Sequence, residues 1–184
     1  MKVEQSIPLV DEILTRHQND VGDLFPAYRN HVCRMLNYCF ALSESAANPC
    51  SDEERRKLII AGCFHDLGIW PGGSLAYLEP SIALANVYLI ETGQSDWSDE
   101  IGRMINQHHK LRAVRGDTSR LVELFRRADL IDVSLGLQRF GLSQSFVQQV
   151  SGAFPNLGFH KALVRLGIKQ LIRSPWNPMP MIKW

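Results

Sequence analysis

Apolar residues recur with the 3.6-residue period of an α-helix along almost the whole chain. No segment alternates apolar and polar side chains as a half-buried strand does. The pattern therefore predicts an all-α fold, a bundle of helices packed through their apolar faces. Helices are expected over residues 7–18, 26–45, 52–67, 80–92, 98–111, 119–135, 143–152 and 159–173.

The length of 184 residues and the short predicted loops indicate one domain over residues 1–184. With 45% apolar and 21% charged residues, the composition is that of a globular protein, which excludes a disordered chain or a fibre. The last segment, residues 174–184, contains three prolines and cannot be helical. The bundle is therefore expected to end in an irregular, Pro-rich C-terminal tail.

Several local signals predict where the helices begin and end. Ser51 with Glu54 three residues later forms the pattern of a capping box at a helix N-terminus. Four glycines fall just past periodic runs and are expected to end helices in the left-handed conformation: Gly68, Gly93, Gly116 and Gly136.

The net charge of +1 conceals two halves of opposite sign. Residues 1–102 carry seven Lys and Arg against fifteen Asp and Glu, whereas residues 103–184 carry thirteen against four. This asymmetry favours an anionic ligand near the second half. The basic residues do not form a run long enough to predict binding to a nucleic-acid polymer.

The four cysteines have no C-x-x-C spacing, and three lie in strongly apolar helical patterns, where a reduced cysteine behaves as a small hydrophobe. They indicate a reducing compartment, and the expected location is cytoplasmic. The N-terminal residues show no apolar core of a signal peptide, and no apolar run approaches the ~18 residues that span a bilayer. No membrane partner is expected.

Histidines and aspartates stand inside several of the apolar helical patterns. They are His31, the pair His65 and Asp66, the pair His108 and His109, and Asp129 with Asp132 three residues later. Burying a carboxylate costs several kcal/mol unless a cation or hydrogen-bond donors compensate its charge. Aspartates on two apolar helices and histidine on a third therefore predict one shared divalent metal ion. His17 and His160 are not accompanied by other candidate ligands, so we expect them to be hydrogen-bonded core or surface histidines.

The local spacing also suits a metal. Adjacent residues of a helix project about 100° apart, so His65 and Asp66 can both reach an ion placed between them. Gly62 lies on the same face and is expected to leave room for an ion or ligand. A mixed imidazole and carboxylate set suits Mn, Fe, Co, Ni or Zn, with Mg also allowed, and the lack of Cys ligands argues against a structural zinc site.

The order His31, His65-Asp66, Asp129 resembles the H…HD…D signature of the HD-domain superfamily of metal-dependent phosphohydrolases. The strings around it, Cys-Phe-His-Asp-Leu-Gly at 63–68 and Arg-Ala-Asp-Leu-Ile-Asp at 127–132, also resemble that family. The resemblance covers about residues 26–136, which would form the HD core, followed by C-terminal helices and the tail over 137–184. It implies an all-α bundle with the metal between central helices.

By this resemblance His31, His65, Asp66 and Asp129 are the metal ligands. His108 and His109 resemble the pair with which some HD branches hold a second metal or contact substrate. Those branches usually carry a further histidine in a stretch that here reads Glu79-Pro80-Ser81, so one ion and two ions both stay open. Leu67 follows the motif where the deoxynucleotidase branch soon has an acidic residue. Asp132 is expected to orient a histidine or to pair with an arginine.

The expected function is hydrolysis of a phosphoester in a small phosphorylated molecule, a nucleotide being one candidate. Asp66 and Lys110 are the expected catalytic residues, since Asp66 can receive the proton of the attacking water. Arg34, Lys110 and Arg112 are expected to bind the phosphate oxygens. Two alternatives remain: a cyanamide-hydratase-like enzyme on the same scaffold, and a non-catalytic nucleotide-binding regulatory module. A homo-oligomer is also left open.

Overall fold

A computed structural model describes residues 1–113, 120–177 and 179–182. Every regular element within those residues is a helix, which confirms the all-α prediction. The elements are α1 (Pro8–Thr15), α2 (Gln18–Val21), α3 (Phe25–Ser45), α4 (Asp52–Phe64), α5 (Ile69–Gly72), α6 (Leu78–Glu91), α7 (Ser98–Gln107), α8 (Arg120–Val133), α9 (Gln144–Ala153) and α10 (Phe159–Arg173), with 3-10 turns at Gly22–Leu24 and Ser95–Trp97.

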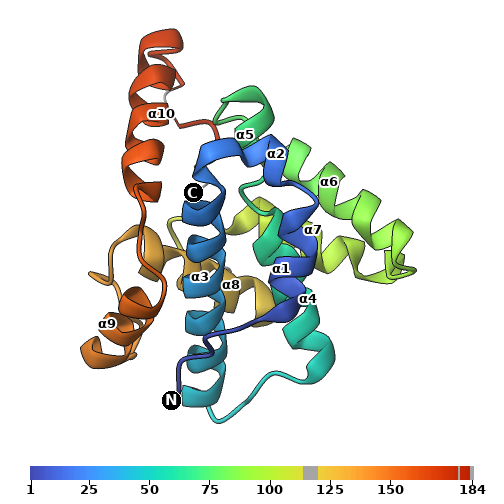
Figure 1. The fold of residues 1–184 in the computed structure, drawn as a ribbon, viewed down its shortest axis with the longest axis vertical. Helices are drawn as coiled ribbons and strands as arrows, with labels where there is room; N and C mark the ends of the chain where they lie inside the picture. Colours follow the sequence, from blue (N-terminus) through green and yellow to red (C-terminus); the bar gives the residue numbers. More distant parts are fainter. Residues whose placement is uncertain (114–119, 178, 183–184) are drawn as a thin grey trace.

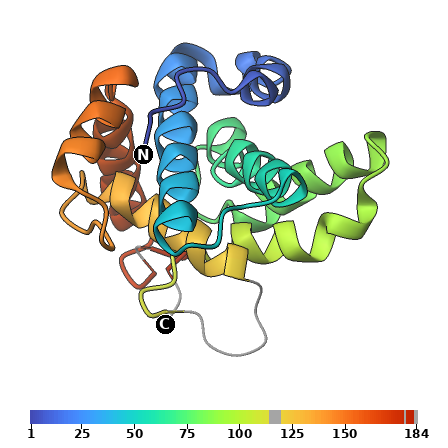
Figure 2. The same cartoon turned by 90° about the horizontal axis from the view of Figure 1, so that it is seen from below.

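The long helix α3 runs through the centre of the molecule (Figures 1 and 2). Most of its residues are buried, because other helices cover nearly all of its faces. Helix α8 packs against it most extensively, α1 and α4 lie on one side, and α9 and α10 lie on the other. The side chains on α3 therefore meet those of α4 and α8 in the interior, where a buried site can form.

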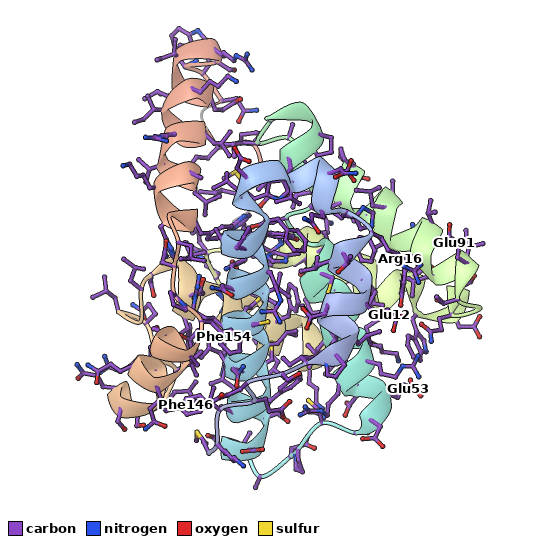
Figure 3. All side chains as sticks on the ribbon, in the orientation of Figure 1. Glu12, Arg16, Glu53, Glu91, Phe146 and Phe154 are labelled. Carbon is purple, nitrogen blue, oxygen red and sulfur yellow. The ribbon has the colours of Figure 1, made fainter. Side chains whose placement is uncertain are left out.

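Helix α9, in the C-terminal part of the chain, packs against α3 through aromatic side chains. Phe146 and Phe154, near the two ends of α9, point toward α3 and belong to the main core (Figure 3). On the opposite side, Arg16, just after α1, forms an ion pair with Glu12 of α1 and another with Glu91, and the second pair links this end of α1 to α6. These exposed pairs contribute little stability, so the apolar core holds the arrangement.

The predicted start of α4 is confirmed. The Ser51 hydroxyl accepts a hydrogen bond from the Glu54 backbone N–H, and the Glu54 carboxylate accepts one from the Ser51 N–H. Helices α4 and α7 end earlier than expected, at Phe64 and Gln107. After α4 the backbone tightens into i→i+3 hydrogen bonds, from Leu67 N–H to the carbonyl of Phe64 for example. The paired candidate residues thus occupy turns just beyond two helix ends.

Two of the four glycine predictions are confirmed, since Gly93 and Gly136 have φ of 69° and 78°. The prediction for Gly68 is wrong, because its φ is −64° and the chain continues into α5. Gly116 lies outside the described residues. Gly68 is small for another reason: a Cβ there would lie 2.7 Å from the Tyr77 carbonyl oxygen and 2.9 Å from the Ser81 nitrogen. The start of α6 can approach the turn after α4 only because this side chain is missing.

We therefore expect Gly68→Ala to lower the free energy of unfolding by about 1–3 kcal/mol, the usual result of overpacking a close backbone contact. The matched control is Gly72→Ala in α5, where an added Cβ meets nothing within 4 Å and leaves stability nearly unchanged. Urea unfolding followed by circular dichroism measures both variants. Equal midpoints for the two alanine variants would contradict the proposed role of Gly68.

The expectation for Gly62 is wrong. A Cβ at this position would lie 3.1 Å from Met35 Cε and 3.3 Å from Leu36 Cδ2. The missing side chain therefore brings α4 close to α3, and the space beside it is filled by α3 rather than open to a ligand.

The C-terminal tail is irregular where it is described, at residues 174–177 and 179–182, as expected. Met181 packs against a small apolar cluster formed by Ile69, Leu75, Tyr77 and Leu78, whereas Trp176 is 98% exposed. In the described part of the chain, no helix is both long and apolar enough to cross a bilayer. All four cysteines are free thiols, as the reduced state predicts.

Candidate metal centre

Six candidate side chains converge in the interior between α3, α4, α7 and α8. They are His31 of α3, His65 and Asp66 in the turn after α4, His108 and His109 after α7, and Asp129 of α8. All are buried except His109, whose side chain is 20% exposed. The structure thus brings together candidates that lie as much as 98 residues apart in the sequence.

Four of these residues, which we call the first ligand set, place their polar atoms around one point. The set comprises His31, His65, Asp66 and Asp129. The two Nε2 atoms of the histidines are 3.0 Å apart. Asp66 Oδ2 lies 3.8 and 3.5 Å from them, and Asp129 Oδ1 lies 3.7 and 3.8 Å from them. Ligand atoms at about 2.1 Å from a metal are about 3.0–3.4 Å apart. The two Nε2 atoms match this range and the carboxylate oxygens lie 0.1–0.4 Å beyond it, close enough for His31, His65 and Asp66 to hold one ion.

The hydrogen bonds of the other ring nitrogens determine which atoms face the centre. His65 Nδ1 lies 2.8 Å from the Gly62 carbonyl oxygen, and His31 Nδ1 lies 2.7 Å from the Asp132 carboxylate. Because these oxygens only accept hydrogen bonds, both Nδ1 atoms carry the proton. Each Nε2 then presents its lone pair to the centre, which is the arrangement found in metal-ligating histidines.

Two Nε2 lone pairs facing each other at 3.0 Å repel unless a positive charge lies between them. A proton is a poor choice for His65, since burial lowers the pKa of this histidine to about 3. Both carboxylates of the set also retain a buried oxygen without a hydrogen-bond partner, Oδ1 of Asp66 and Oδ1 of Asp129. Buried, unsatisfied polar atoms of this kind indicate a missing partner. The residues present therefore fit a divalent cation.

Asp66 also belongs to a second ligand set, which it forms with His108 and His109. Asp66 Oδ1 lies 3.5 Å from His108 Nε2, and His109 Nδ1 lies 4.0 Å from Asp129 Oδ2. His108 donates its Nδ1–H to the Ile105 carbonyl at 2.6 Å, so its Nε2 also faces inward. Burial lowers the pKa of His108, but the neighbouring carboxylates of Asp66 and Asp129 outweigh it and raise that pKa above its usual value.

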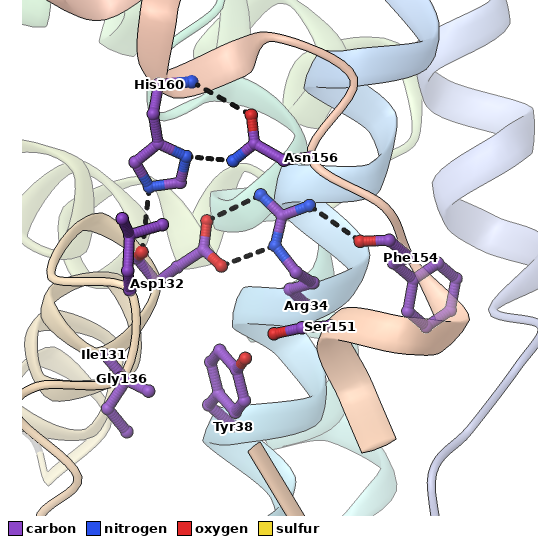
Figure 4. A pocket seen from close by; sticks show the side chains of 10 residues that line it. Arg34, Tyr38, Ile131, Asp132, Gly136, Ser151, Phe154, Asn156 and His160 are labelled. Atoms are coloured by element: carbon purple, nitrogen blue, oxygen red, sulfur yellow. Dashed lines mark hydrogen bonds and ion pairs between the residues drawn. The ribbon is translucent and has the colours of Figure 1, made fainter. Parts of the chain in front are cut away.

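Asp132 supports the centre from outside the first ligand set (Figure 4). Besides accepting from His31, its carboxylate forms a two-pronged ion pair with Arg34, with bonds of 2.5 and 2.9 Å. Burial alone would raise the pKa of Asp132, but these hydrogen bonds from His31 and Arg34 hold it well below its usual range. The expectation that Asp132 orients a histidine or pairs with an arginine matches both contacts.

The same geometry overturns the expectation for Arg34. Its guanidinium is buried, and besides Asp132 it binds the Phe154 carbonyl oxygen at 2.9 Å (Figure 4). One turn of α3 separates Arg34 from His31, so both side chains reach the same carboxylate of α8 instead of a substrate. Arg34 lines a cavity of about 170 Å³, and none of the six candidate ligands lines it. Arg34 is therefore a structural partner of Asp132 and is removed from the substrate-binding candidates.

The other two basic candidates follow the histidine pair in the sequence. Lys110 is half-buried and directly follows His109, and Arg112 is exposed two residues further on. Arg126 donates to the Lys110 carbonyl oxygen at 3.2 Å and pairs with Glu123, which fixes the backbone at this point. Both predicted phosphate-binding side chains thus follow the histidine pair on the same segment.

Three residues near the centre were not predicted. Phe159, the first residue of α10, stacks on the His31 ring with centroids 4.2 Å apart. Tyr77 places its hydroxyl 2.6 Å from His109 Nε2 and 3.3 Å from His108 Nε2. His160 lies against the Asp132 carbonyl oxygen at 2.9 Å. An aromatic residue in an apolar pattern looks like core in the sequence, so only the fold shows which ones contact the centre.

The pKa of one candidate ligand, Asp129, predicts that the affinity for a metal depends on pH. Burial raises the pKa of Asp129 to about 6, against the charges of His108 and His31, which lower it. A ligand must lose its proton to bind a metal. Affinity for Mn²⁺ should therefore be constant above this pKa and should fall by about tenfold per pH unit below it.

Calorimetric titration of the metal-free protein with Mn²⁺ between pH 5.0 and 7.5 measures this dependence. Neighbouring histidines hold the pKa of Asp66 well below its usual value despite burial. Its carboxylate therefore stays ionised between pH 5.0 and 7.5 and causes no change in affinity there. An affinity that stays constant from pH 7.5 to pH 5.0 would exclude Asp129 as a ligand.

Nothing matches this chain among family models, curated proteins or solved structures.

Proposed function

We propose that this protein is a metal-dependent phosphohydrolase of the HD type, acting on a small phosphorylated molecule. The observation that carries the proposal is the pair of buried Nε2 atoms facing each other at 3.0 Å, flanked by two carboxylates with unpartnered oxygens. Such a site needs a cation. Phosphoester hydrolysis is the reaction that the order of the ligands, as an H…HD…D pattern, favours.

His31, His65, Asp66 and Asp129 would hold the cation, and Mn, Fe, Co, Ni or Zn suits this mixed set, with Mg also allowed. A divalent cation bound there lowers the pKa of a coordinated water toward neutrality and polarises a phosphoryl oxygen. In the reaction, the water oxygen forms a bond to phosphorus, the ester P–O bond breaks, and the alcohol leaves with a proton.

The protein's own groups then have separate tasks. Asp66 Oδ1 has no hydrogen-bond partner and lies 3.5 Å from His108 Nε2, so it can accept the proton of the water and share it with His108. Lys110 and Arg112 supply positive charge for the phosphate oxygens on the side of His109. Burial of His31 and His65 excludes bulk water from their ring nitrogens, which strengthens the electrostatic interactions inside.

One observation favours a second candidate. His109 is the only member of the cluster whose side chain is more than about a twentieth exposed, which gives the substrate a narrow approach. A narrow approach suits a small molecule, and a hydratase that adds water to a nitrile-like carbon would use the same ligands. Consumption of cyanamide without phosphate release would favour this candidate.

The test combines metal analysis with a phosphatase screen. The purified protein, stripped and reloaded with Mn²⁺ or Ni²⁺, is expected to release phosphate from at least one member of a panel of nucleotides, sugar phosphates and an aryl phosphate, and a chelator should abolish the release. A nucleotide that survives purification and is never hydrolysed would point instead to a regulatory binding module.

A further inference from the structure

The hydroxyl of Tyr77 contacts both histidines of the second ligand set. It is 2.6 Å from His109 Nε2 and 3.3 Å from His108 Nε2. The third member of the set, Asp66, is near enough that burial and then the charge of this carboxylate raise the pKa of Tyr77 well above its usual value. The tyrosine ring is itself only 1% exposed and packs among Ile69 and Leu75, so its position is fixed.

A second cation would need the same space. An ion bound by Asp66, His108 and His109 would stand about 2.1 Å from each ligand atom, and the phenolic oxygen already lies within hydrogen-bond distance of both imidazoles. Tyr77 is also an unfavourable ligand, because a phenolate would have to form in a buried place beside two carboxylates. Its 2.6 Å contact with His109 is shorter than the roughly 3.0 Å that separates two ligands of one ion.

We propose that the Tyr77 hydroxyl takes the place of a second cation, so that the centre holds one ion per chain in the first ligand set. This inference rests on the proposed function, since it concerns the same centre. It identifies the feature that distinguishes a one-ion from a two-ion centre in this chain, which the missing histidine near Glu79 alone does not decide.

A one-ion centre restricts the chemistry. Two-ion mechanisms, in which a second metal stabilises the leaving oxygen or in which two irons share oxygen, are excluded. The leaving oxygen of the substrate must instead meet a hydrogen-bond donor of the protein. His109 is placed for this task, because the Tyr77 hydroxyl contacts its Nε2 at 2.6 Å and its side chain is the exposed member of the cluster. The favoured substrate is a phosphomonoester whose leaving group takes up a proton.

The number of bound ions tests the proposal directly. Metal-free wild-type protein is titrated with Mn²⁺ by calorimetry, and the metal content after desalting is measured by mass spectrometry. One ion per chain is expected. Two ions would overturn the role of Tyr77 and leave the proposed function intact, whereas no bound ion would overturn the proposed function itself. An absorption band of a phenolate–iron(III) bond after loading with iron would show Tyr77 as a ligand and would also overturn the proposal.

Two substitutions separate the hydroxyl from the ring. Tyr77→Ala opens the space and is expected to bind a second Mn²⁺, detected by the magnetic coupling of two neighbouring ions in electron paramagnetic resonance. Tyr77→Phe keeps the ring and removes only the hydroxyl, so it is also expected to bind a second Mn²⁺. Because Tyr77→Ala removes a buried ring and lowers stability, Tyr77→His, which keeps a side chain and adds a ligand, provides the second test. A folded Tyr77→Ala or Tyr77→His protein that still binds one ion would contradict the proposal.

Discussion

Replacement of Asp66 by alanine is expected to abolish metal binding and activity while leaving the fold intact. Asp66 is the one residue that belongs to both ligand sets, and its Oδ1 is the atom proposed to accept the proton of the water. Loss of a supporting contact typically reduces metal affinity 10–100-fold, so loss of this ligand should reduce it more than about a hundredfold. Phosphate release should fall by at least about a thousandfold.

The matched control is Asp96→Ala, which removes an exposed carboxylate of the same half of the chain. It should bind Mn²⁺ and release phosphate as the wild type does. Circular dichroism establishes that both variants are folded, and calorimetry and phosphate release measure the effect. A folded Asp66→Ala protein with wild-type metal content would contradict the assignment of the ligands.

Replacement of Asp132 by alanine is expected to have the largest effect on stability. It leaves the buried guanidinium of Arg34 without its counter-ion, and a buried charge stripped of its partner costs about 3–5 kcal/mol. It also removes the acceptor for His31 Nδ1–H, which should reduce affinity for Mn²⁺ by about 10–100-fold. Urea unfolding in the presence of a chelator measures the first effect separately from the second.

A double variant separates the two roles of Asp132. Arg34→Met with Asp132→Leu replaces the ion pair by apolar side chains and should recover much of the lost stability. It should not recover the metal affinity, because His31 still lacks the acceptor that orients its ring. A single variant destabilised by less than about 1 kcal/mol, or a double variant with full metal affinity, would contradict this account.

Much of the candidate centre could be predicted from the sequence because its residues stand in or directly after apolar helical patterns. An aspartate or histidine in such a pattern needs a partner, and the spacing along α3, α4 and α8 orders the ligands as an H…HD…D pattern. The structure then shows how the residues meet: α3 packs against both α4 and α8, so His31 Nε2 lies 3.8 Å from Asp66 and 3.7 Å from Asp129. The all-α fold class could be predicted from the 3.6-residue period of the apolar residues in the same segments.

Other features could not be predicted, because they depend on how helices approach one another. Arg34 looked like an available cation one turn from His31, but the position of α8 gives its guanidinium a carboxylate instead. Gly62 looked like room for a ligand, but α3 fills the space. The early ends of α4 and α7 depend on local backbone hydrogen bonds that periodicity does not reveal.

The contacts of Tyr77 and Phe159 could not be predicted from the sequence either. Each lies in an apolar stretch where an aromatic residue indicates only a core position, and neither is close in sequence to the residue that it touches. Tyr77 meets His109 across 32 residues, and Phe159 meets His31 across 128. Both contacts follow from the packing of α6 and α10 around the centre.

The central claim is that a metal held by His31, His65, Asp66 and Asp129 hydrolyses a phosphoester. Its most direct test is phosphate release by the purified protein over the panel of phosphorylated compounds, measured with Mn²⁺ and again with excess chelator. The account predicts release from at least one compound that stops with the chelator and returns when Mn²⁺ is restored. Release that continues at the same rate in the chelator, or none from any compound by protein shown to contain the metal, would contradict it.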